Sequence, residues 1–72
     1  MNIEKNFVSS SNVEAVGYDE ATQTVRVWFL NGSVYDYGNV NILEYEALRD
    51  APSVGSYLHR NFKGQYPYQK VG

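Results

Sequence analysis

The sequence predicts an α+β fold: a three-stranded antiparallel meander followed by two short helices packed on one face, with a candidate short C-terminal strand. Two alternating apolar runs flank Asn31-Gly32, which is typical of a β-hairpin. After Tyr37 the apolar spacing becomes helical, and capping residues precede two short segments. The chain has 72 residues and no cysteine, so we expect one small core that is stable without disulfides.

Residues 1–8 are expected to form an N-terminal arm, or a short edge strand if Phe7 and Val8 find a partner. Residues 9–72 form the single domain, because no repeat, low-complexity tract or linker divides them. A polar connection joins the first two strands, with the length that neighbouring antiparallel strands use. The three strands are expected at residues 13–18, 24–30 and 33–37.

The register of the hairpin decides which side chains face the helices. A two-residue loop would place Val27 opposite Asp36 and leave a carboxylate among the apolar side chains of the second strand. A three-residue loop, with Gly32 left-handed in a G1 bulge, places Arg26 opposite Asp36 instead. We therefore predict the bulged register, in which each side chain has a suitable neighbour.

The bulged register also assigns the aromatic side chains to the two faces of the sheet, since a slip of one residue would exchange the faces. It turns Tyr35 and Tyr37 toward the valines under the helices, which favours core packing over a base-stacking platform. Trp28 and Val34 are expected on the opposite face. There, either the N-terminal arm or residues 66–71 cover them, or they form a protein interface.

The first helix is predicted over residues 42–50. Asn41, with Glu44 three residues later, forms a capping box at its start. The helical spacing then places Tyr45 and Leu48 on the buried side.

The second helix is predicted over residues 54–62. Pro52 stops the first helix, because the residue before a proline avoids helical geometry, and Ser53 is the candidate cap of the second. Gly64 ends the second helix, and residues 66–71 are expected to be extended along a sheet edge.

Charge is distributed unevenly along the chain, although the net charge is only −2. All eight acidic residues and three basic ones lie in residues 1–50, whereas residues 51–72 hold three basic residues and no acidic one. The net charge argues against a protein that coats duplex DNA through bulk electrostatics. An anionic partner, such as RNA or a nucleotide, is therefore expected to meet the C-terminal third.

The candidate nucleic-acid-binding residues lie on and after the second helix. Cationic side chains on one helical face could neutralise phosphates while a tyrosine stacks on a base. The alternative is a solvated helix face, whose cations lie favourably near its C-terminal end. The candidates are Tyr57, His59, Arg60, Lys63 and Tyr66.

No pattern of catalytic, cofactor-binding or metal-ligating residues is present in the sequence. His59 is the only histidine and there is no cysteine, so a metal site is not expected. Turn and capping roles account for the close acidic pairs, so we do not expect an enzyme. The longest apolar run has four residues, at 27–30, and the N-terminus lacks a signal pattern. We expect a cytoplasmic protein with no membrane partner.

A series of short motifs extends from the first strand to the second helix. They are Ser10-Ser11-Asn12-Val13, Val16-Gly17-Tyr18-Asp19, Val25-Arg26-Val27-Trp28-Phe29, Gly32, Tyr35-Asp36-Tyr37, Val40, Tyr45, Leu48, Ala51, Ser53, Gly55-Ser56-Tyr57-Leu58-His59 and Phe62-Lys63. Over residues 9–63 the chain thereby resembles the KTSC domain, a short domain at the C-terminus of some lysyl-tRNA synthetases and a stand-alone protein in bacteria and phages. The family commonly has proline at the position of Asn41, and an aromatic residue followed by asparagine at Leu58-His59.

The resemblance implies a small non-enzymatic binding module, for which RNA binding has been suggested. With the charge distribution, it makes RNA or nucleotide-phosphate binding the first hypothesis. The second hypothesis is a protein-interaction module that contacts its partner through Trp28 and Val34. If phage-encoded, such a module would act on a host protein in the host cytoplasm. The oligomeric state is left open.

Overall fold

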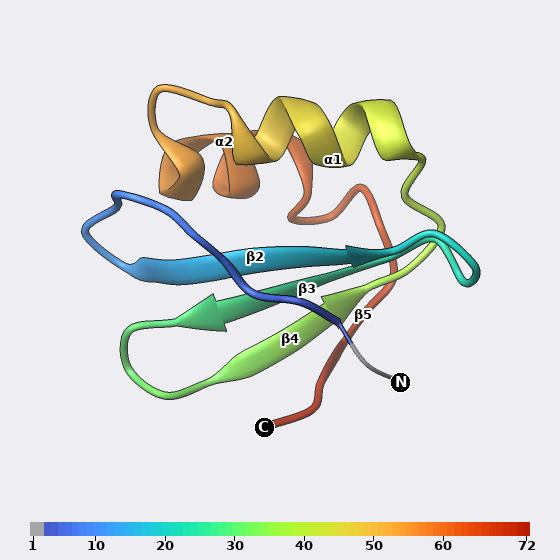
Figure 1. Ribbon diagram of the computed structural model, residues 1–72, viewed down its shortest axis with the longest axis horizontal. Coiled ribbons are helices and arrows are strands. Elements are labelled where there is room, and N and C mark those ends of the chain that lie inside the picture. The colour runs from blue at the N-terminus through green and yellow to red at the C-terminus, as the bar shows by residue number, and fades with distance from the viewer. Residues whose placement is uncertain (1–2) are drawn as a thin grey trace.

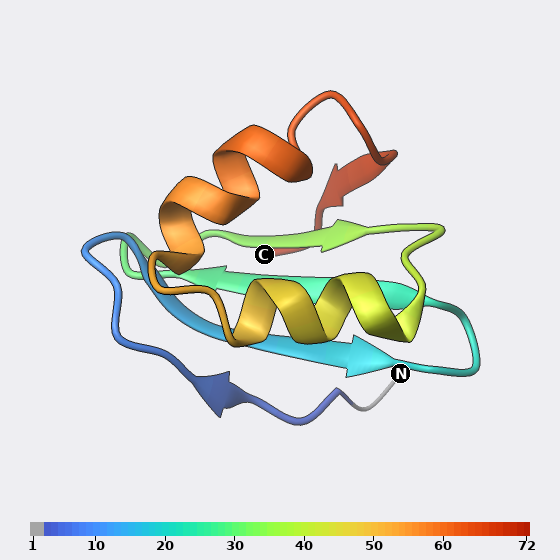
Figure 2. The ribbon, with the colours of Figure 1, turned by 90° about the horizontal axis from the view of Figure 1, so that it is seen from above.

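The computed structural model describes residues 3–72 and shows an α+β domain built on one five-stranded antiparallel sheet. The strands lie across the sheet in chain order, and both helices cover the same face (Figure 1). Seen from above, α1 lies over β2 and β3, whereas α2 is displaced toward β4 and β5 (Figure 2). The elements are β1 (Asn6–Phe7), β2 (Val13–Asp19), β3 (Thr24–Phe29), β4 (Val34–Tyr37), α1 (Ile42–Arg49), α2 (Val54–Asn61) and β5 (Tyr68–Lys70).

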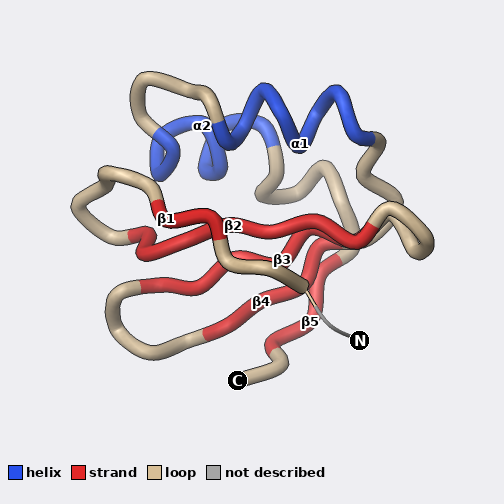
Figure 3. The backbone as a smooth tube through the Cα atoms, viewed as in Figure 1, coloured by secondary structure: helices blue, strands red, loops and turns tan. Residues whose placement is uncertain are grey.

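The predicted fold class is confirmed, but two edge strands extend the three-stranded meander (Figure 3). On one edge, Phe7 pairs with Ala15, and the Val8 N–H donates to the Glu14 carbonyl at 3.1 Å. Asn6 and Phe7 therefore form the short edge strand that was the alternative to an arm, and residues 1–2 of the expected arm lie outside the described residues. On the other edge, β5 pairs with β4 as the candidate C-terminal strand.

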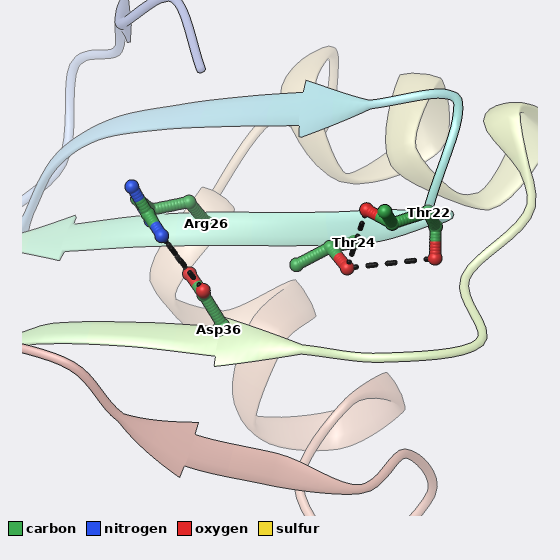
Figure 4. Close-up of polar contacts among 4 residues, drawn as sticks. All are labelled: Thr22, Thr24, Arg26 and Asp36. Atoms are coloured by element: carbon green, nitrogen blue, oxygen red, sulfur yellow. Dashed lines mark hydrogen bonds and ion pairs between the residues drawn. The ribbon is translucent and has the colours of Figure 1, made fainter. Parts of the chain in front are cut away.

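The bulged hairpin register is confirmed. Gly32 has φ of 94°, a left-handed conformation that favours glycine, and its N–H donates to the Phe29 carbonyl. Arg26 pairs with Asp36, and two hydrogen bonds of 2.7 and 2.8 Å join the guanidinium to the two carboxylate oxygens. Figure 4 shows this ion pair between β3 and β4, with Thr24 at the start of β3. Its fork geometry reinforces the register that the backbone pairing defines.

The core fills the space between the sheet and the two helices. Tyr37 and Phe62 meet edge to face, with ring centroids 5.6 Å apart. Phe62, the residue that follows α2, is among the largest fully buried side chains, so it holds the end of α2 to the sheet. The buried hydrophobic residues are Val13, Ala15, Val16, Val25, Val27, Tyr37, Val40, Tyr45, Leu48, Val54, Leu58 and Phe62.

Both helices begin at the predicted caps and end one residue earlier than predicted. The Asn41 side chain accepts from the Glu44 N–H at 2.9 Å, and the Ser53 hydroxyl accepts from the Ser56 N–H at 3.4 Å. The Glu44 carboxylate instead accepts a hydrogen bond from the Tyr57 hydroxyl, and so links α1 to α2. Within residues 3–72, neither helix has the length and apolar character needed to cross a membrane.

Candidate nucleic-acid interface

A groove lies between α2 and the part of the sheet that the helices leave uncovered. We call it the α2 groove. It consists of two adjoining hollows, of about 260 Å³ and about 100 Å³. The larger is lined by Phe29, Asn31, Ser33, Tyr35, Tyr37, Lys63 and Tyr68, and the smaller by Asn12, Phe29, Tyr37, Gly55, Leu58, His59 and Lys63.

The floor of the larger hollow is aromatic. Tyr35 is half-buried and Tyr68 is 61% exposed, and their ring centroids are 6.0 Å apart. Phe29 meets Tyr35 edge to face at 5.7 Å and supports it from β3. Tyr68 lies on β5, the edge strand of the sheet, where its ring remains accessible. Exposed aromatic rings on a sheet face are what stacking on unpaired bases requires.

The alternation of side chains along β4 places Tyr35 and Tyr37 on the same face, as predicted, but their surroundings differ. Tyr37 lies under α2 with 5% of its surface exposed, and burial raises the pKa of its hydroxyl. Core packing is therefore confirmed for Tyr37. Tyr35 is half-buried and packs against the core, as predicted, and like Tyr37 it also lines the groove.

Lys63 supplies positive charge at the rim of the groove. Lys63 lines both hollows, and His59 lines the smaller one. Lys70 pairs with Tyr35 across β4 and β5 and therefore lies on the same face of the sheet. None of the described residues that line either hollow is acidic. Arg60 is exposed on α2 but lines neither hollow.

Two of the predicted site residues, Tyr57 and Tyr66, lie away from the α2 groove. The Tyr57 hydroxyl donates to Glu44 at 2.6 Å, and this hydrogen bond raises the pKa of Tyr57 to about 12. The Tyr66 ring packs against Phe62 at 5.0 Å, and burial raises the pKa of its hydroxyl. The structure therefore brings only His59 and Lys63, of the five candidates, to the groove.

Sequence reasoning missed the contributions of Tyr68 and Asn12 to the groove. Tyr68 reaches it because β5 pairs with β4, which places Tyr68 opposite Tyr37. The only signal for this pairing was the extended segment after Gly64, which carried no register. Asn12 reaches the groove because the loop before β2 lies against α2. A Cβ on Gly55 would overlap the Asn12 side-chain oxygen.

The face of the sheet opposite the helices carries Trp28 and Val34, both half-buried. The Lys5 ammonium lies 5.3 Å from the Trp28 ring centroid and 5.8 Å from that of Phe7. Gly72 lies against Val34, which belongs to β4. Both chain ends therefore cover part of this surface, while Phe7 remains 70% exposed. We call the surface formed by Lys5, Phe7, Trp28 and Val34 the open face.

The protein is thus a small α+β domain. Two helices cover one face of its sheet, and an aromatic groove lies beside the second helix. The chain belongs to the KTSC domain family, whose model matches residues 9–66. The crystal structure of a KTSC domain protein from Yersinia pestis has a TM-score of 0.90 to this chain at 26% identity, covering 99% of this chain and all of the other.

The relatives of known sequence include both large and small proteins. A lysine–tRNA ligase of Nostoc sp. is 39% identical over 61 residues, which are 85% of this chain and 11% of the ligase. An uncharacterised protein of Stutzerimonas stutzeri is 34% identical over 65 residues, or 89% of this chain and 92% of that protein. The chain therefore spans a small part of the ligase and nearly the full length of the smaller relative.

Proposed function

We propose that this KTSC domain binds single-stranded RNA in the α2 groove. The proposal is carried by the half-buried ring of Tyr35 and the exposed ring of Tyr68 next to Lys63, in a groove whose described lining residues include no acid. Aromatic faces stack on unpaired bases of any sequence, and a neighbouring cation neutralises the backbone phosphate. An RNA partner is also supported by the homologous segment in a lysine–tRNA ligase, because the name of that enzyme gives a transfer RNA as its substrate.

The same geometry favours single strands over duplexes. Bases stacked within a duplex cannot present their faces to Tyr35 and Tyr68. Binding to a duplex would rest on phosphate contacts, for which this chain, with its net charge of −2, offers few cations. We therefore expect modest affinity that depends on stacking as well as on salt.

The test is a titration of a fluorescein-labelled single-stranded RNA of about 12 nucleotides, followed by anisotropy at low salt. Lys63→Ala should weaken binding and reduce the slope of log affinity against log salt by about 1. Arg60→Ala is the matched control, because it removes a nearby cation, on α2, that lines neither hollow. Tyr68→Ala should weaken binding at least about fivefold, since stacking contributes about 1–3 kcal/mol per base.

The wild-type protein should bind the single strand more tightly than a duplex of the same sequence. No measurable binding at low salt would contradict the proposal. So would equal losses for Arg60→Ala and Lys63→Ala, because these would indicate long-range attraction rather than a groove. Thermal unfolding of each variant checks that a lost affinity is not a lost fold.

A second candidate function is a protein contact through the open face, favoured by the exposed Phe7 beside Lys5 and Trp28. Exposed aromatic clusters are common at interfaces. A partner that binds there should be captured by the wild type and by Leu43→Ala, which removes an equally exposed side chain from α1. It should be lost with Phe7→Ala and with Trp28→Ala, and its retention by both variants would contradict this assignment.

A further inference from the structure

The two hollows of the α2 groove meet at three shared residues, Phe29, Tyr37 and Lys63. Phe29 and Tyr37 belong to the sheet floor, and Lys63 follows α2 on the opposite wall. Lys63 therefore borders the larger aromatic hollow on one side and the smaller hollow on the other. An anion next to this ammonium group would lie between two compartments.

The two compartments offer different chemistry. The larger is lined by the rings of Tyr35 and Tyr68, and aromatic rings stack on any base. The smaller is lined by Asn12, Leu58 and His59. The Asn12 side-chain oxygen accepts from the Ser10 hydroxyl at 3.1 Å, which leaves the NH2 group of the amide to donate to the edge of a base.

Gly55 determines the shape of the smaller hollow. Any Cβ at this position in the first turn of α2 would overlap the Asn12 side-chain oxygen. The absence of a side chain at Gly55 therefore lets the Asn12 amide lie against the helix. A larger residue at position 55 would displace Asn12 and change the hollow without touching the tyrosines.

We infer that the α2 groove binds a dinucleotide step of single-stranded RNA, with the linking phosphate at Lys63, one base on the tyrosine floor and the neighbouring base in the hollow beside Asn12. This inference rests on the proposed function and adds to it the length of the unit recognised. It also assigns the two bases unequal roles. The floor stacks without choosing among bases, and the Asn12 hollow selects by hydrogen bonding.

The experiment compares two small probes that each carry one phosphate group. Uridine monophosphate has one base, and the dinucleoside monophosphate of two uridines has two bases and less negative charge. NMR titration of the labelled protein should show the dinucleoside monophosphate binding at least about fivefold more tightly, since each stacked base contributes about 1–3 kcal/mol. If charge alone governed binding, uridine monophosphate would be the tighter ligand.

Two variants locate the second base. Asn12→Ala should reduce the affinity for the dinucleoside monophosphate toward that for uridine monophosphate, and leave the latter within about twofold. Gly55→Ala should do the same by displacing Asn12, and alanine is the better helix former, so α2 should persist. Asn61→Ala is the matched control, because this exposed asparagine of α2 lines neither hollow.

The outcomes separate this inference from the proposed function. If the longer single strand binds but the two small probes bind equally, the dinucleotide step is wrong and the RNA-binding groove stands. An Asn12→Ala variant that keeps the full advantage of the dinucleoside monophosphate would equally overturn the inference. If the longer strand itself fails to bind at low salt, the proposed function fails first.

Discussion

Two pairs of tyrosines lie on the helix side of the sheet, and the pairs differ in how far they are buried. Between β2 and α1, Tyr18 and Tyr45 stack with centroids 5.1 Å apart and planes 14° from parallel. Both hydroxyls are hydrogen-bonded, since Tyr18 donates to the Val40 carbonyl and Tyr45 accepts from the Asn6 amide at 2.9 Å. We call Tyr18 and Tyr45 the closed pair.

In the second pair, Tyr35 and Tyr68 lie 6.0 Å apart with planes at 45°, and we call them the open pair. Among the described residues, neither hydroxyl has a hydrogen-bond partner. The closed pair thus packs beside α1, whereas the open pair is accessible to a ligand beside α2. The difference lies in position, because Tyr45 is buried on α1 with 4% of its surface exposed, whereas Tyr68 lies on the edge strand β5 and is 61% exposed.

The largest predicted effect separates the pairs by stability. Tyr45 is 4% exposed, so Tyr45→Ala should lower the free energy of unfolding by about 3–5 kcal/mol through lost burial and a cavity. Tyr68 is 61% exposed, so Tyr68→Ala should lower it by less than about 1 kcal/mol. Urea denaturation measures both. Equal losses would contradict the division into closed and open pairs.

The burial of Tyr45 and the face of Tyr35 were predictable from the sequence, and the position of Tyr68 was not. The cap at Asn41 sets the phase of α1, and this phase buries Tyr45. Likewise, only one hairpin register keeps Asp36 out of the core, and that register places Tyr35 on the inner face. These conclusions rest on local spacing, which sequence displays directly.

The open pair depends on longer-range features. The exposed strand β5 shows no apolar alternation, so its register, and with it the position of Tyr68, cannot be read from the sequence. The displacement of α2 is equally hidden, because it follows from how Phe62 packs against Tyr37. Tyr57 was assigned to the site because it lies close in sequence to His59, but on α2 it points toward α1 instead.

A smaller effect on the free energy of unfolding is expected when the hydroxyl of one tyrosine from each pair is removed. Tyr18→Phe removes the donor to the Val40 carbonyl, which belongs to a fully buried residue, and should cost about 1–2 kcal/mol. Tyr35→Phe removes a hydroxyl that has no hydrogen-bond partner among the described residues, and should change the unfolding free energy by less than about 0.5 kcal/mol. Paired urea titrations give the difference. A larger loss for Tyr35→Phe would reverse the comparison.

The smallest predicted effect concerns Tyr57, which the sequence placed in the binding site and the structure places at the contact between α1 and α2. Its hydrogen bond to Glu44 raises the pKa of Tyr57 to about 12, from the value near 10 of an exposed tyrosine. A raised folded-state pKa means that this stabilisation is fully present below pH 10 and is lost as the pH rises through 12. Because the contact is near the surface, screening reduces its contribution to about 1 kcal/mol.

Tyr57→Phe should therefore be less stable than the wild type by about 1 kcal/mol at pH 8, and the difference should vanish as the pH approaches 12. Urea titrations of both proteins at several pH values measure it, and the other tyrosines, which are common to both, cancel in the difference. The variant should also bind the single-stranded RNA within about twofold of the wild type, because Tyr57 lines neither hollow. If Tyr57→Phe lost as much RNA affinity as Tyr68→Ala, the ligand would have to lie across α2, and the binding surface would include the contact between the helices.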